Sequence, residues 1–166
     1  SPYNLTTNPG GSSSGSGAAV SANLITFALG TETDGSVINP AERNAVVGIK
    51  STVGLTSRAG VIPESHNQDT VGCLARTMRD ATYCLDGIYG PDQRDNYTLV
   101  QKAPADGYAQ FLTKKTALKG ARFGIPWATF WRYTPPNQLA QLLELLNLIQ
   151  SAGATITNGT EFKDPS

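Results

Sequence analysis

The chain has 166 residues, enough for one domain with a hydrophobic core. Its 13 basic and 13 acidic residues cancel, so neither a basic nucleic-acid interface nor an acidic tail is expected. An apolar fraction of 39% argues against disorder, and no apolar run approaches the ~18 residues of a membrane span. The chain begins without Met and without a signal-peptide pattern, so we expect a segment of a longer protein.

The two cysteines, Cys73 and Cys84, are too few for a disulfide framework or a zinc site. They could form one bridge, but the sequence favours two buried free thiols. Three N-x-[S/T] sequons, about as many as chance gives, indicate secretion only weakly, and the localisation stays open between the cytoplasm and secretion. The sequons begin at Asn4, Asn96 and Asn158.

Short apolar runs alternate with turns in the first 50 residues. Small residues at helical spacing predict a short buried helix over 18–24 whose first turn starts near Gly15. Buried strands are expected at 25–30 and 45–49, separated by the polar turn TETDGS and a short segment. The next stretch, 51–75, is rich in Gly and Thr, which is typical of irregular or short β structure.

The helix signals are stronger further along the chain. Thr77-Met78-Arg79-Asp80 has the form of a capping box and predicts a helix to about Tyr89, stopped by Gly90-Pro91. Residues 91–118 are polar and loop-like, with one helical turn expected near 108–112.

The C-terminal part predicts a strand at 121–126, a helix from 135 or 136 to about 152, and a final strand at 154–157. Thr134 is the expected N-cap of that helix, with a Pro at its first position. Strands that alternate with helices predict an α/β fold with a mixed, partly parallel β-sheet flanked by helices.

Four interpretations compete for the Ser- and Gly-rich segment NPGGSSSGSG at 8–17. By composition alone it would be a flexible linker beside an ordinary domain. Phosphate binding is not supported, because no Lys follows the glycines and no Rossmann pattern is present. A G-x-S-x-G elbow can be centred on Ser13, with His66 and Asp69 completing a triad on paper. That elbow needs an apolar strand before it, which the preceding residues do not provide.

The fourth interpretation is amide hydrolysis by a serine. This chemistry needs a nucleophile, a proton shuttle and donors for the oxyanion. Without histidine, a neutral lysine can act through a second hydroxyl. The turn 33–36 contains Gly and lies between a buried strand and a short segment that could be helical, so its successive backbone N–H groups could bind an oxyanion. Ser12, in another tight Gly-rich turn, would be the relay.

Two segments in this order resemble the amidase signature family, whose core reads roughly G-G-S-S-[GS]-G-[GS] and later G-T-[DE]-T-[GD]-G-S. They are Gly10–Ser16 and Gly30–Ser36, and their key serines are 24 residues apart, as in the family. The E-T-D-G-S variant is most similar to the peptide-amidase-like branch. Shorter matches follow in order, among them VGIK at 47–50, SRAG at 57–60 and QDTVG at 68–72.

The resemblance covers most of the chain. It is dense over 9–90, which would be the signature core, and it continues more thinly over 91–166 as a loop, strand, helix and strand. It therefore implies that 1–166 is part of a single amidase domain with a mixed β-sheet between helices.

The resemblance also implies a Ser–cis-Ser–Lys triad that works through an acyl-enzyme, with no metal or organic cofactor. Ser36 matches the nucleophile and Ser12 the serine with a cis peptide bond that relays protons. The oxyanion hole would be formed by the backbone N–H groups of Thr33, Asp34, Gly35 and Ser36. Apart from the resemblance, candidate pocket positions are Ser13, Asp69 and His66. Asp69 could equally cap a loop, and His66 is expected to be structural or pocket-lining rather than a base.

Some positions depart from the family pattern. The catalytic lysine of the family lies upstream of the first serine motif, and no lysine precedes Ser12 here. Lys50 matches a different, downstream family lysine and is interpreted as structural. Ile38 stands where many members have Arg, which favours neutral amides. Glu32 and Asp34 are expected to make turn and capping hydrogen bonds rather than to act as bases.

We therefore expect an amide hydrolase for linear, neutral carboxamides that is complete only with the remaining parts of the same enzyme. Its partner would be a small-molecule amide, with no nucleic acid expected. One alternative is an inactive fragment or homologue with a binding or structural role, suggested by the absent lysine. A second is an amidotransferase-type glutaminase, against which the neutral charge weighs.

Overall fold

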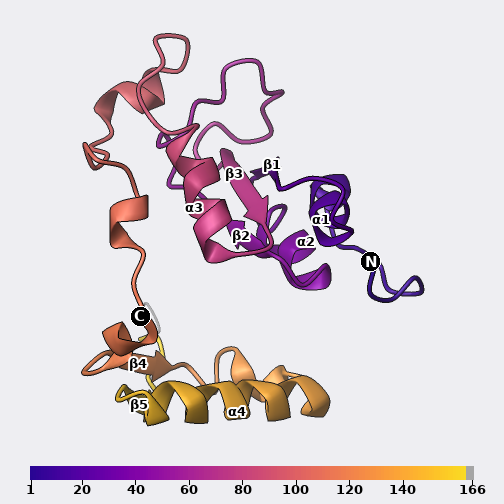
Figure 1. The fold of residues 1–166 in the computed structure, drawn as a ribbon, viewed down its shortest axis with the longest axis vertical. Helices are drawn as coiled ribbons and strands as arrows, with labels where there is room; N and C mark the ends of the chain where they lie inside the picture. The colour runs from indigo at the N-terminus through magenta and orange to yellow at the C-terminus, as the bar shows by residue number, and fades with distance from the viewer. Residues whose placement is uncertain (164–166) are drawn as a thin grey trace. The chain divides into compact units, whose positions relative to one another are not determined.

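The computed structural model describes residues 1–163, so the end of the expected 91–166 continuation lies outside the described residues. The chain divides into two compact units, Ser1–Leu112 and a second unit that starts at Thr113 (Figure 1). Each unit combines helices with a β-sheet, which confirms the α/β class. No helix within residues 1–163 is long and apolar enough to cross a membrane.

The first unit is built on a three-stranded antiparallel sheet of order β1-β3-β2. Strands β1 (Phe27–Glu32) and β2 (Val47–Ile49) fall where strands are expected, within two residues. The central strand β3 (Thr70–Ala75) lies at the end of the stretch expected to be irregular or short β structure. Both edge strands pair with β3. In this register Ala75 has Phe27 of β1 as its partner on one side and Val47 of β2 on the other.

Successive side chains of β3 point to opposite faces of the sheet and create two cores. Leu74 packs with the helices α1 (Ser14–Ser21) and α2 (Ile38–Arg43), and Cys73 packs with α3 (Met78–Asp86). The first unit therefore has three layers, with α3 across one face of the sheet (Figure 1). The two cores comprise Val20, Val37, Ala41 and Leu74 on one face and Leu55, Cys73, Cys84 and Leu85 on the other.

The two cysteines are buried and unbridged, as the sequence favours. Burial raises the pKa of both the Cys73 and the Cys84 thiols, so both stay protonated at neutral pH. They act as small apolar core residues between β3 and α3.

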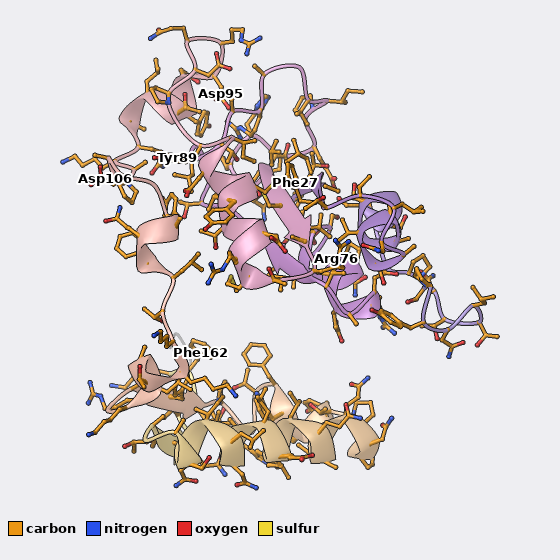
Figure 2. The ribbon with its side chains drawn as sticks, in the orientation of Figure 1. Phe27, Arg76, Tyr89, Asp95, Asp106 and Phe162 are labelled. Atoms are coloured by element: carbon orange, nitrogen blue, oxygen red, sulfur yellow. The ribbon has the colours of Figure 1, made fainter. Side chains whose placement is uncertain are left out.

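Polar contacts hold the helices at their ends. The Thr77 hydroxyl accepts a hydrogen bond from the Asp80 backbone N–H (3.1 Å) and donates to the Asp80 carboxylate (2.7 Å), which confirms the predicted cap of α3. Arg76, labelled in Figure 2, donates from Nη1 to the carbonyls of Val20 and Ile25 and so ties the end of β3 to the connection between α1 and β1.

Short 3₁₀ turns lie in the connections after α3. The turn expected near 108–112 is η2 (Ala109–Phe111). The others are η1 (Asn96–Val100), η3 (Lys115–Leu118) and η4 (Trp131–Tyr133).

The second unit contains the parallel pairing expected from the sequence, between β4 (Arg122–Ile125) and β5 (Thr155–Asn158). Helix α4 (Pro136–Ser151) connects the two strands. Its predicted N-cap, Thr134, is wrong by one residue: Pro135 has extended backbone angles (φ −54°, ψ 141°) and itself occupies the cap position.

A buried carboxylate joins β1 to α2. Glu32, only 4% exposed, accepts hydrogen bonds at Oε2 from the N–H groups of Val37 (2.7 Å) and Ile38 (2.9 Å). Burial alone would raise the pKa of this carboxyl group. Hydrogen bonds from the backbone at Ile38, Val37 and Gly35 and the charge of Lys50 outweigh burial and hold the pKa below its ordinary value.

The α3 cap gives a first prediction. Thr77→Ala leaves the Asp80 N–H without its partner and should lower the free energy of unfolding by about 1 kcal/mol. Urea denaturation measures this change. The control is Thr52→Ala, at an exposed threonine whose hydroxyl has no partner among residues 1–163; equal losses in the two variants would contradict the prediction.

The Glu32 contacts give a pH-dependent prediction. Glu32→Gln should lower the free energy of unfolding at pH 7 by about 2 kcal/mol, because it replaces charge-assisted hydrogen bonds with neutral ones. Since folding lowers the pKa of Glu32, its contribution is present above the ordinary value of 4.5 and is lost as pH falls through the lowered folded value. Urea denaturation from pH 7 to pH 3 should therefore show the two proteins converging in acid; a constant difference would be inconsistent with this origin.

Candidate active site

The two serine motifs adjoin in the structure, although they are far apart in the sequence. The Ser13 N–H donates to the Ser36 carbonyl (3.1 Å), and the Gly11 N–H donates to Asn39 Oδ1 (3.3 Å). Asn44, fully buried, donates from Nδ2 to the Pro9 carbonyl (2.8 Å). The segment 9–13 is thereby fixed against Ser36, at the end of the turn 33–36, and against α2.

Ser13 joins α1 to the edge strand β1. Its hydroxyl accepts a hydrogen bond from the Thr31 N–H (3.1 Å) and lies 3.2 Å from the Thr31 carbonyl, to which it can donate. Gly30 permits this approach, because a Cβ there would lie 2.7 Å from Ser13 Oγ and 2.9 Å from Leu74 Cδ1. Ser16 adds a bond from its hydroxyl to the Leu29 carbonyl (2.7 Å). The Ser- and Gly-rich segment is thus docked on the sheet, and the linker interpretation is wrong.

The loop before α1 carries an unusual backbone. The Gly11–Ser12 peptide bond is cis, and Gly10 has φ +77°. A Cβ at Gly10 would meet Asn39 Oδ1 at 2.5 Å, so only glycine allows the loop to pack this closely on α2. The Ser12 side chain is exposed and that of Ser36 is half-buried, and neither hydroxyl has a hydrogen-bond partner among residues 1–163.

In the turn from Thr33 to Ser36, carbonyl groups accept hydrogen bonds from the protein, whereas most of the N–H groups have no partner among residues 1–163. Two of its carbonyls are used: Gly35 accepts from the Asn39 N–H (2.7 Å), and Ser36 accepts from the Ser13 N–H. Within the described residues, the N–H groups of Thr33, Asp34 and Ser36 have no hydrogen-bond partner. Gly35 has φ +89°, a conformation that favours glycine and bends the turn into α2. The Gly35 N–H is engaged by the Glu32 carboxylate, so the free donors beside the serine are those of Thr33, Asp34 and Ser36, and free backbone donors at such a place suit oxyanion binding.

Two carboxylates flank this turn. Glu32 binds the N–H groups of Val37 and Ile38, where the turn enters α2, which confirms the capping role expected for Glu32. Asp69, 8% exposed, accepts at Oδ1 from the Thr33 hydroxyl (2.6 Å) and at Oδ2 from the N–H groups of Glu64 (2.8 Å) and Ser65 (2.9 Å). The hydrogen bond from Thr33 is the main reason that the pKa of Asp69 lies below its ordinary value, against the opposing effect of burial.

His66 lies in the loop that Asp69 closes. Its side chain is exposed beside a cavity of about 240 Å³, and its carbonyl accepts from Arg58 Nη1 (2.6 Å). No hydrogen bond among residues 1–163 joins Ser13 to His66 or His66 to Asp69, so the triad written for a G-x-S-x-G elbow is not assembled there. No group of three or more His, Cys, Asp or Glu side chains in this part of the chain is arranged to hold a metal ion.

Sequence reasoning missed several residues that shape the site. Asn39 and Asn44 attach the first serine loop to α2, and the ion pair of Arg58 with Asp95 (3.1 Å) supports the loop that ends at Asp69. The Thr33 side chain was also missed, because only its backbone N–H was considered. The motif SRAG gave a signal for Arg58, but it did not identify the distant Asp95.

Comparisons with known proteins identify the family of the chain. The family model described as Amidase matches residues 1–162. A Schizosaccharomyces pombe protein named as an amidase is 57% identical over 164 residues, which cover 97% of this chain and 28% of that protein. The crystal structure of peptide amidase from Stenotrophomonas maltophilia superposes with a TM-score of 0.82 and 41% identity, covering 95% of this chain and 32% of the other. A glutamyl-tRNA(Gln) amidotransferase protein of Microcystis aeruginosa is 39% identical over 155 residues, or 93% of this chain and 31% of that protein.

The chain thus spans about a third or less of the length of these relatives. The family model nevertheless covers nearly all of it, including both serine motifs and the strands and helix of the second unit. The chain belongs to the amidase family.

Proposed function

We propose that this chain supplies the nucleophile and the oxyanion donors of an amide hydrolase. The Ser36 hydroxyl attacks the carbonyl carbon of a carboxamide and gives up its proton, and the carbonyl oxygen becomes a tetrahedral oxyanion. Collapse of that intermediate breaks the C–N bond and releases ammonia or an amine, which takes up a proton. Water then hydrolyses the acyl ester on Ser36.

The observation that carries the proposal is the turn from Thr33 to Ser36. It presents backbone N–H groups without partners next to the proposed nucleophile, and the carbonyls of Gly35 and Ser36 are held by α2 and by the Ser13 N–H. Donors that are already oriented need no reorganisation when negative charge develops on the substrate oxygen. The Ser13 to Ser36 hydrogen bond brings the loop of the second serine to the same place.

Proton transfer would use Ser12 and a lysine. The Ser12 side chain is exposed, so its hydroxyl is free to act as a relay between Ser36 and an amine. Lys50 is a poor candidate for that amine, because it is exposed at the end of β2 and its charge acts on the buried Glu32. We assign the amine to a lysine in the remaining parts of the same enzyme, and we propose that both units belong to one amidase domain, since the family model spans them.

The substrate class that fits best is a linear, neutral carboxamide. Ile38, two residues after Ser36, is 50% exposed and offers no cation for an anionic substrate. The nearby carboxylates of Glu32 and Asp69 are already engaged by backbone and hydroxyl donors. A relative whose name is peptide amidase is similar to this chain over 95% of its length, which agrees with a neutral amide as substrate.

Ammonia transfer to an aminoacyl-tRNA is a second candidate, because the Microcystis aeruginosa amidotransferase protein is 39% identical. The 57% identity of the amidase-named Schizosaccharomyces pombe protein favours hydrolysis. Ammonia release from neutral carboxamides, measured against release from glutamine, separates the two candidates.

Replacing Ser36 tests the proposal directly. In the complete enzyme, Ser36→Ala should reduce ammonia release from a neutral carboxamide by at least about 10³-fold, because no hydroxyl remains to be acylated. A fluorophosphonate, which phosphonylates activated serines with loss of fluoride, should leave its phosphonyl group on the Ser36 peptide of the wild type and not on that of the variant. Ser14→Ala, in the same motif, serves as the control with normal turnover. Normal turnover of Ser36→Ala would remove Ser36 as the nucleophile, and a wild type without turnover or adduct would favour an inactive homologue.

Ser12 and Ser13 are adjacent serines with different expected effects. Ser12→Ala should lower kcat by about 10²-fold through loss of the proton relay, with little change in stability. Ser13→Ala removes the hydroxyl bonded to Thr31 and should mainly lower the free energy of unfolding, by about 1 kcal/mol. Steady-state kinetics and urea denaturation of both variants measure the contrast, and the reverse pattern would reassign the relay to Ser13.

A further inference from the structure

We propose that Asp69 is a positioning residue, which holds the oxyanion turn in place through the Thr33 side chain and takes no part in proton transfer. The inference rests on the proposed function, because it assigns the turn from Thr33 to Ser36 to oxyanion binding. It concerns the hydroxyl of Thr33, whereas oxyanion binding uses the backbone N–H of that residue.

The carboxylate of Asp69 bridges two segments of the chain. One oxygen accepts from the Thr33 hydroxyl at 2.6 Å, and the other accepts from the N–H groups of Glu64 and Ser65. Both oxygens are thus occupied by donors that belong to the protein itself. A carboxylate used in this way is a poor proton acceptor and a good anchor.

The β-ladder determines why these two residues meet. The last pair of the β1–β3 ladder joins Glu32 to Thr70. Thr33 follows Glu32, and Asp69 precedes Thr70, so the two side chains lie just beyond the last pair and face the same end of the sheet. Asp69 binds Thr33 at the start of the turn, and Glu32 binds the N–H groups of α2 at its end. The turn 33–36 is therefore held at both ends.

The anchor has its own support, from the loop that begins near Arg58. Arg58 forms an ion pair with the buried Asp95 (3.1 Å) and stacks on the Tyr97 ring at 4.3 Å. From Nη1 it donates to the carbonyl of His66 (2.6 Å) and reaches that of Asp69 (3.5 Å). Asp95, labelled in Figure 2, also accepts from the Arg58 N–H (2.9 Å). Asp69 is therefore attached to a side-chain network and not to a free loop.

Losing the Thr33 contact would release one end of the turn without removing any group that touches the substrate. Small displacements of donors weaken the stabilisation of charge that develops in the transition state more than they weaken ground-state binding. The expected signature is a lower kcat with a nearly constant KM.

The test is a double-mutant cycle in the complete enzyme, with a neutral carboxamide as substrate. Asp69→Asn keeps one acceptor oxygen for the two loop N–H groups and offers Thr33 an amide that cannot accept its proton. Thr33→Val removes the hydroxyl and keeps the shape. Each variant should lower kcat about 10- to 100-fold with KM within about threefold, and Thr33→Ser should restore kcat to near the wild-type value. The double variant should be no slower than Thr33→Val alone, because Thr33→Val already removes the bond to Asp69 together with the longer contact of the same hydroxyl with Glu64 Oε2 (3.3 Å).

Thr77 and Asp80 provide a matched control, since they form the same hydroxyl–carboxylate bond at 2.7 Å outside the site. Thr77→Val and Asp80→Asn should lower the unfolding temperature by amounts similar to the site variants and leave kcat unchanged, with active enzyme counted by the fluorophosphonate adduct. This count separates a misplaced turn from a smaller folded fraction.

Several results would overturn the inference: normal kcat in Thr33→Val, multiplied effects in the double variant, or loss of kcat in the controls as well. If Asp69→Asn fails to fold, Thr33→Val alone tests the inference, because this variant keeps the hydrogen bonds of Asp69 to the N–H groups of Glu64 and Ser65. A wild-type enzyme without turnover or adduct would refute the proposed function instead, so the two failures are distinguishable.

Discussion

The antiparallel pairing of the central strand β3 is the constraint on which the first unit depends. Leu74 and Cys73, adjacent on this strand, are both fully buried, one beneath α1 and α2 and the other beneath α3. A one-residue slip would exchange these two faces, so the cores fix the register. The same register determines which residues lie beyond the last pair of β1 and β3, where the candidate site is found. Hydrophobic packing on both sides of one strand thus sets the positions of polar groups at its end.

The carboxylates near Ser36 illustrate how burial and hydrogen bonding assign roles. Glu32 and Asp69 are surrounded by donors, and the pKa of each lies below its ordinary value. A general base works best with a pKa near the working pH, so a carboxylate stabilised as an anion is poorly suited to remove a proton from a serine. The donors that stabilise them belong to α2, to Thr33 and to the loop 64–69, which makes both carboxylates structural elements of the turn.

Local signals in the sequence predicted the elements whose causes are local. The capping box at Thr77 predicted α3, and the proline expected at the first helical position predicted the start of α4 to within one residue. The central strand was the hardest to recognise, because TVGCLA does not alternate between polar and apolar residues. A strand buried on both faces has no reason to alternate, and its glycine is needed where β2 passes close by. The cap at Thr134 was misplaced because two consecutive prolines left the first helical residue ambiguous.

The candidate site also combines residues that local sequence patterns identify with contacts that depend on distant parts of the chain. The serine motifs could be identified from the sequence because their close contacts require particular residue types. Only glycine at position 30 leaves space for Ser13, and only glycine at position 10 leaves space for Asn39. The Asp69–Thr33 contact, by contrast, joins residues 36 positions apart, and it exists only because the β1–β3 register brings the two strand ends together. The sequence alone does not decide whether Asp69 lines a pocket or caps a loop, because the answer depends on which residue of a distant strand end lies beside it. The groups proposed to perform the chemistry can therefore be recognised from the local sequence pattern, whereas the groups that hold them in place follow from the packing of the sheet.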